Sequence, residues 1–242
     1  MKRIVLFLAA AILFGGALQS CDKENNNGNN NGNNNGGGNG GGATSVQWVD
    51  LGLPSGLLWA DRNVGADNLE DYGNYYAWGE TSPKEVYDWD TYAYGNYFDA
   101  LTKYCTKPND GLNGFTDNLT TLEASDDAAT VNIGGKARMP RDYEWEELMD
   151  NTTSTWTTRN GVYGRKFTAS NGKSIFLPAA GDYEDDELQN AGEYGLYWSS
   201  TLVIDYPYDA WFFNFNWRYQ EMENTDGSGR VYGLPVRAVR AK

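Results

Sequence analysis

Apolar and polar positions follow different patterns in different parts of the chain, and each pattern predicts a different kind of structure. Residues 4–13 form an uninterrupted apolar run, whereas residues 25–42 are almost entirely Asn and Gly. From residue 46 onward, apolar residues come in short runs separated by Gly and Asn, as expected for β-strands between turns. The strands predicted in this way are 174–179, 196–200, 210–215, 217–221, 230–232 and 233–240.

One segment has helical periodicity instead. In residues 140–149 the apolar Trp145, Leu148 and Met149 lie at positions i, i+3 and i+4, with glutamates on the opposite face. Asp142 is expected at the N-cap or in the first turn, where its carboxylate complements the helix dipole. Many short strands with one or two short helices predict the α+β fold class, built on a mostly antiparallel sheet.

The C-terminal strands carry a dense group of aromatic side chains. In the predicted strand 210–215, Trp211, Phe213 and Phe215 share one face, and we expect this face to point into the core. Trp198 and Trp211 are accordingly predicted to be core residues rather than ligand contacts.

The N-terminus has the features of a targeting segment. Lys2 and Arg3 precede an apolar run that is short for a membrane-spanning helix. The sequence LQSC at residues 18–21 resembles the lipobox of bacterial lipoproteins, in which cleavage before the cysteine leaves a thiol that carries diacylglycerol. We therefore predict a lipoprotein signal peptide at 1–20 and lipidation, including palmitate, at Cys21. A plain secretory signal with an incidental cysteine is the alternative.

The residues after Cys21 predict a tether. The sequence DKE at residues 22–24 resembles the signal that sends lipoproteins of Bacteroidetes-type bacteria to the cell surface, although an ordinary charged linker begins in the same way. The Asn/Gly tract cannot bury enough apolar area to fold, so residues 21–45 are expected to be a disordered linker. Residues 46–242 are long enough for one domain, in which 107–130 is polar and predicted to be rich in loops. We expect an outer-membrane lipoprotein at the cell surface, bound to the membrane through the lipid on Cys21.

Composition excludes several functions. The chain has a formal net charge of −14, and without Lys2 and Arg3 it has 17 basic and 33 acidic residues, a net charge of −16. This charge argues against a nucleic-acid partner. The chain has no histidine, which excludes His-based triads and the commonest zinc sites. Cys105 is the only other cysteine, so no intrachain disulfide is available once Cys21 is lipidated.

An ordered set of segments resembles a known family, the Fibrobacter succinogenes major paralogous domain, which is abundant in surface lipoproteins of Bacteroidetes-type bacteria. The segments that carry the resemblance are 49–60, 63–66, 72–80, 137–140 with Glu144, Trp145 and Leu148, 176–181, 195–200 and 233–240. The family is related to the C-type-lectin-like fold, so the resemblance implies a compact α+β domain whose N- and C-terminal strands pair.

The resemblance also bears on single residues. It places Arg138, Arg237 and Arg240 in the framework of the fold, and we interpret them as partners of buried or rim acids in structural ion pairs. Arg141 stands where the family has Thr at the start of the helix, so the cap is expected to shift to Asp142.

Enzymatic and metal chemistry have little support. The formylglycine-generating enzymes share the fold but need paired cysteines, and Cys105 is alone, so we predict no catalytic residues and no cofactor. The carboxylates of Asp182, Glu184, Asp185 and Asp186 are a candidate calcium site, because Ca²⁺ prefers oxygen ligands. A solvated acidic loop is the alternative.

Two C-terminal loops are the best candidates for ligand contacts. Tyr206 and Tyr208 flank a proline in one loop, and Trp217, Arg218 and Tyr219 follow the aromatic strand. Aromatic side chains beside an arginine suit carbohydrate stacking and protein hot spots alike. The sequence therefore predicts a non-catalytic surface module that binds an extracellular glycan or protein. The alternatives are a structural or adhesive envelope component that assembles with another protein subunit and, disfavoured, an enzyme of the formylglycine-generating type.

Overall fold

A computed structural model describes residues 46–224 and 229–242. The predicted signal peptide, lipidated Cys21 and linker therefore lie outside the described residues. Within the described part, no helix is both long enough and apolar enough to cross a membrane.

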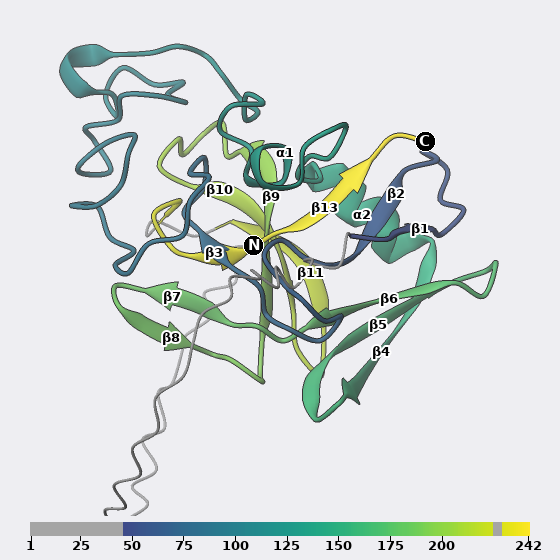
Figure 1. The fold of residues 1–242 in the computed structure, drawn as a ribbon. Coiled ribbons are helices and arrows are strands. Elements are labelled where there is room, and N and C mark those ends of the chain that lie inside the picture. The colour runs from purple at the N-terminus through teal and green to yellow at the C-terminus, as the bar shows by residue number, and fades with distance from the viewer. Residues whose placement is uncertain (1–45, 225–228) are drawn as a thin grey trace, which may run out of the picture. The chain divides into compact units, whose positions relative to one another are not determined.

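The two ends of the described chain meet in one sheet (Figure 1). Strand β2 (Leu58–Asn63) lies between β1 (Trp48–Asp50) and β13 (Arg237–Arg240), and both pairings are antiparallel. The register places Trp59 opposite Val49 on one side and opposite Val239 on the other. The prediction that N- and C-terminal strands pair is confirmed.

Four more sheets complete the described part of the fold, and all their pairings are antiparallel. One sheet contains β9 (Gly195–Leu202), β10 (Ala210–Phe215) and β11 (Gln220–Asn224). A second contains β4 (Thr152–Arg159), β5 (Val162–Ala169) and β6 (Ser174–Pro178). Two-stranded pairs are formed by β3 (Tyr75–Tyr76) with β12 (Leu234–Pro235) and by β7 (Asp182–Glu184) with β8 (Glu187–Gln189).

Helices are few and short in the described residues. They are α1 (Ala128–Ile133), α2 (Asp142–Asp150) and the 3₁₀ turn η1 (Leu112–Gly114). The prediction of an α+β fold with a mostly antiparallel sheet is confirmed. Helix α1 begins at the end of the segment predicted to be loops, and the Asp127 carboxylate caps it by accepting the Thr130 N–H at 2.9 Å.

Strand β10 runs between two groups of core side chains, so both of its faces are buried. Phe213 and Phe215 pack with the helix residue Trp145, whereas Phe212 packs on the other side with Trp198. The predicted inward face is confirmed for Phe213 and Phe215, and the opposite face of the strand is buried as well. Trp198 is a core residue as predicted, but Trp211 is only half-buried because the register of β10 against β9 shifts there.

Helix α2 begins as predicted, but its cap differs. Arg141 is the N-cap, and its backbone N–H donates to the Glu144 carboxylate at 2.8 Å, as in a capping box. Asp142 is the first helical residue, and its carboxylate accepts the Thr201 hydroxyl at 2.9 Å. Asp142 is thus a first-turn acid and not the cap.

Arg138 donates two hydrogen bonds to the Glu144 carboxylate, both at 2.6 Å, which confirms the predicted ion pair of this framework arginine.

The other two framework arginines do not form ion pairs within the described part of the chain. Arg237 is fully buried and donates to neutral oxygens of Asn63, Ala60 and Phe176. The Arg240 guanidinium lies 4.6 Å from the centre of the Trp48 ring. The predicted ion pairs of these two residues are wrong.

Candidate ligand-binding pocket

The first wall of the pocket is the hairpin of β4 and β5. Asn160 and Gly161 join the strands with φ of 47° and 85°, the two successive positive values that a tight hairpin turn needs. Thr158 pairs with Tyr163 and Trp156 pairs with Arg165, so Trp156 and Tyr163 are diagonal neighbours on one face. Their rings stack with centroids 6.0 Å apart and an angle of 12° between the planes.

The second wall is the turn between β10 and β11. The side-chain oxygen of Asn216 accepts the N–H groups of Arg218 at 2.7 Å and of Tyr219 at 3.1 Å. This local network holds the turn and directs Trp217 outward, with 62% of its surface exposed. The Arg218 guanidinium lies 4.3 Å from the centre of the Trp217 ring, a cation–π contact that covers one face of the indole.

The third wall is the loop before β9. Gly192 donates its N–H to Ala179 O at 2.7 Å, and Glu193 and Tyr194 both donate to Asn190 O at 3.0 Å. These bonds fix the loop against the rest of the fold. Glu193 is exposed and Tyr194 is half-buried.

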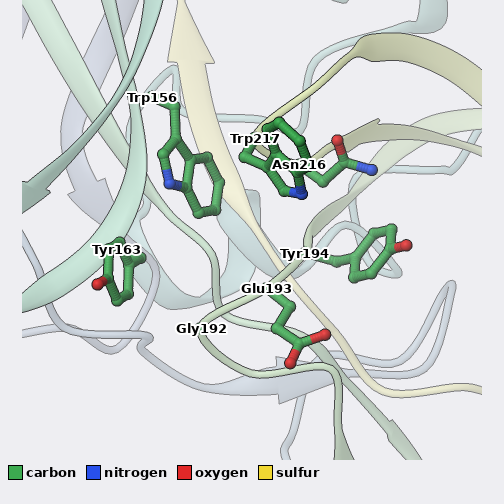
Figure 2. Close-up of a pocket in the computed structure, with 7 residues that line it drawn as sticks. All are labelled: Trp156, Tyr163, Gly192, Glu193, Tyr194, Asn216 and Trp217. Carbon is green, nitrogen blue, oxygen red and sulfur yellow. The ribbon is translucent and has the colours of Figure 1, made fainter. Parts of the chain in front are cut away.

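Together the three walls enclose a pocket of about 390 Å³. Figure 2 shows Trp156, Trp217 and Glu193 around the same space, with Tyr163 beyond Trp156. The lining residues are Trp156, Tyr163, Gly192, Glu193, Tyr194, Asn216 and Trp217. The pocket thus combines large aromatic surfaces with one carboxylate and one amide, as small-molecule sites commonly do.

A buried arginine joins two of the walls. Arg165 of β5 donates from Nε to Asn216 O at 2.8 Å and from Nη1 to the Ser154 hydroxyl at 2.6 Å. Burial lowers the pKa of Arg165. Because its guanidinium bonds β4 and the Trp217 turn at the same time, Arg165 fixes the position of Trp217 relative to the hairpin.

The structure separates the five ligand residues predicted from the sequence. Trp217 lines the pocket, and the Arg218 guanidinium stacks on the Trp217 ring. Tyr219 follows in the same turn, with 39% of its surface exposed. Tyr206 and Tyr208 belong to a different loop, where their rings are 6.0 Å apart and Lys107 lies over Tyr206 at 5.4 Å.

Sequence reasoning missed most of the pocket. Trp156, Tyr163, Glu193, Tyr194 and Asn216 were not predicted as site residues. The signal for two of them was present, because a Thr-rich run followed by Asn-Gly is typical of a β-hairpin. The loop of Glu193 and Tyr194 has no comparable local pattern.

The candidate calcium ligands lie on the hairpin of β7 and β8. Asp182 accepts the Asn190 amide at 2.9 Å, and burial raises the pKa of this carboxyl. Glu184 accepts the Tyr232 hydroxyl at 3.2 Å, whereas Asp185 and Asp186 are exposed at the turn. Across residues 46–224 and 229–242, no three acidic, Cys or His side chains gather into a group that could hold a metal ion. Calcium binding stays a prediction.

Comparison with protein-family models, with curated proteins and with solved structures gives no match.

The cysteine among the described residues, Cys105, is buried, with its thiol 3.1 Å from Lys107 O. Burial raises the pKa of this thiol.

Proposed function

We propose that this chain is a non-catalytic carbohydrate-binding protein, with the ligand held in the pocket of Trp156, Tyr163, Glu193 and Trp217. The observation that carries the proposal is the exposure of Trp217 beside the stacked pair of Trp156 and Tyr163. Exposing the apolar surface of an indole to water is unfavourable. Because a hydrogen-bonded turn nevertheless holds Trp217 toward solvent, we infer that its ring contacts a ligand.

The chemistry of the pocket suits a sugar ring. The C–H face of a pyranose is apolar and packs against the flat face of an aromatic side chain, while its hydroxyls need hydrogen-bond partners. Glu193 supplies an acceptor and the indole N–H groups supply donors. Because hydrogen bonds of Asn216 and Arg165 fix the walls, little ordering entropy is lost on binding.

The number of carboxyl groups that line the pocket favours binding without catalysis. Most glycoside hydrolases use two carboxyl groups that flank the bond to be cleaved. Glu193 is the one carboxylate among the described residues that line the pocket. We therefore expect a bound glycan to leave the pocket unchanged.

The experiment is a glycan-array screen of the full chain in a detergent without a sugar headgroup, with and without Ca²⁺. We expect binding in at least one condition, and Trp217→Ala should weaken it by about tenfold or more, since a central aromatic contact contributes more than 1 kcal/mol. The matched control is Tyr143→Ala, which removes a similarly exposed aromatic ring from helix α2. The proposal fails if no glycan binds, or if both variants lose affinity equally.

We further propose that the domain has a C-type-lectin-like fold and stands on the outer surface of a bacterium through a lipid on Cys21. Support for the fold comes from the pairing of β2 with β13 and from the family-like segments around the Trp145 helix. Support for the anchor comes from the LQSC sequence at residues 18–21. Cys21→Ser should abolish incorporation of labelled palmitate and release the chain from the membrane fraction. Retained label would contradict the anchor.

A further inference from the structure

A second pocket of about 390 Å³ lies apart from the glycan pocket and shares none of its lining residues. Its lining residues are Tyr87, Asp88, Trp89, Tyr97, Phe98, Glu184, Asp185, Val231 and Tyr232. Five of these side chains are aromatic and three are carboxylates, and none of the nine is basic. We call this set the acidic aromatic cleft.

Backbone hydrogen bonds hold the cleft in shape. Tyr87 N–H donates to Asp185 O at 2.8 Å, and Asp185 N–H returns a bond to Tyr87 O at 3.3 Å. Tyr183 and Gly233 exchange a similar pair at 2.8 and 3.0 Å. A Cβ at Gly233 would come within 2.7 Å of the Tyr87 ring, so only glycine permits this close approach. The hairpin of β7 and β8 is thereby fixed against Tyr87.

The outer wall of the cleft is made of exposed aromatic side chains. Tyr97 is 52% exposed and Phe98 is 39% exposed, with their rings 4.4 Å apart. Phe98 also contacts Tyr208 edge-to-face at 5.8 Å, which extends the aromatic surface toward Tyr206. Two of the ligand residues predicted from the sequence thus adjoin this cleft rather than the glycan pocket.

The carboxylates of the cleft have neutral partners. Asp88 accepts the Thr91 N–H at 2.8 Å and Glu184 accepts the Tyr232 hydroxyl at 3.2 Å. Within the described ranges none of Asp88, Glu184 and Asp185 forms an ion pair. The Lys84 ammonium lies 5.5 Å from the Tyr87 ring centre, but Glu80 neutralises it at 3.0 Å. The cleft therefore carries uncompensated negative charge.

We propose that the acidic aromatic cleft binds an organic ammonium ion, either a lysine side chain of a protein partner or a small quaternary ammonium compound. Aromatic faces attract such cations through the ring quadrupole, and they tolerate the methyl or methylene groups that surround the charge. The carboxylates of Asp88, Glu184 and Asp185 add Coulombic attraction. Three carboxylates without an ion-pair partner attract a cation more strongly than a neutral sugar, so we infer a different ligand for this site from that of the glycan pocket.

The test is calorimetric titration of the full chain with choline, with a lysine blocked at both its α-amino and carboxyl groups, and with 3,3-dimethylbutan-1-ol. The last compound has the shape of choline without its charge. We expect saturable binding of at least one ammonium compound in the range of about 1 mM, and none of the neutral isostere. Binding of choline alone identifies a small quaternary ligand, and binding of the blocked lysine identifies a protein side chain.

Two matched double variants test the carboxylates. Glu184→Gln with Asp185→Asn keeps size and hydrogen bonding, and Asn tolerates the positive φ of 52° at position 185. This variant should weaken ammonium binding about tenfold, whereas Glu146→Gln with Asp150→Asn on helix α2 should leave it unchanged. Trp217→Ala should also leave it unchanged, which separates this site from the glycan pocket. Three results would overturn the proposal. They are equal affinity for the neutral isostere, failure of both ammonium compounds to bind, and wild-type affinity in the Glu184/Asp185 double variant.

Discussion

Arg237 illustrates how a single residue can join three strands without an ion pair. Its guanidinium donates to Asn63 Oδ1 at 2.9 Å, to Ala60 O at 3.0 Å and to Phe176 O at 2.9 Å. Burial lowers the pKa of Arg237 to about 10, which still leaves it charged at neutral pH. Because these acceptors come from β2 and β6, the planar fork of an arginine ties both strands to β13.

Buried tyrosines give the fold a defined response to alkali. Burial raises the pKa of Tyr87 to about 12, and it also raises the pKa of Tyr197 above its usual range. Both hydroxyls donate to backbone oxygens, of Tyr75 at 2.7 Å and of Pro178 at 2.8 Å. A neutral hydroxyl is therefore favoured in the folded state.

The buried tyrosines stabilise the folded state only while their hydroxyls stay protonated. The pKa values in the folded state lie above the unfolded value of about 10, so this stabilisation is complete below pH 10 and is lost as the pH rises toward 12. We expect cooperative alkaline unfolding, followed by circular dichroism, with a step in tyrosinate absorbance at the same pH. Gradual ionisation of all tyrosines in a chain that stays folded would contradict this expectation.

At the scale of elements, the hairpin of β4 and β5 was not predicted, although its Asn-Gly turn is a local hairpin signal. Its first strand is rich in Thr and Ser and has no fully buried residue, and no apolar run marks it in the sequence. The strand 210–215 was predicted with its observed bounds because residues 210–213 form an unbroken apolar run rich in aromatic side chains. The segments 217–221 and 230–232 were misplaced: β11 begins at Gln220, and residues 230–232 form a turn.

The hairpin turn provides a test of this element. Gly161 has φ of 85°, and a Cβ there would meet no atom within 4 Å, so Gly161→Ala introduces backbone strain without a clash. We expect a loss of about 1 kcal/mol in the free energy of unfolding. Glycan binding should weaken too, because the turn positions Trp156 against Tyr163. Denaturant titration and calorimetry measure the two effects.

Gly135→Ala is the matched control. Gly135 has φ of 64° and open space around its Cβ position, but it follows helix α1, outside the glycan pocket. It should cost similar stability and leave glycan affinity unchanged. If both variants weaken binding to the same extent, the hairpin has no specific role in the pocket.

For the whole molecule, periodicity and turn residues are local signals, and they predicted the class of fold. The pairing of the chain ends was implied by the family resemblance and by no local pattern. The sequence predicted the pocket that we propose as the glycan site poorly, and the reason is physical. Trp156, Glu193 and Trp217 come from three segments far apart in the chain, and their proximity depends on Arg165 and on sheet registers that no local pattern encodes. Only Trp217 was identified, because an aromatic residue beside an arginine at the end of a strand is a local feature.

The most direct test uses the indole N–H signals of the nine tryptophans in a ¹H–¹⁵N spectrum of the full chain. On titration with the best glycan from the array, the signals of Trp156 and Trp217 should shift and saturate together. The signals of Trp59, in the core, and of Trp89, in the acidic aromatic cleft, should stay in place. Saturable glycan binding that leaves Trp156 and Trp217 unshifted would contradict the proposal that this pocket is the glycan site.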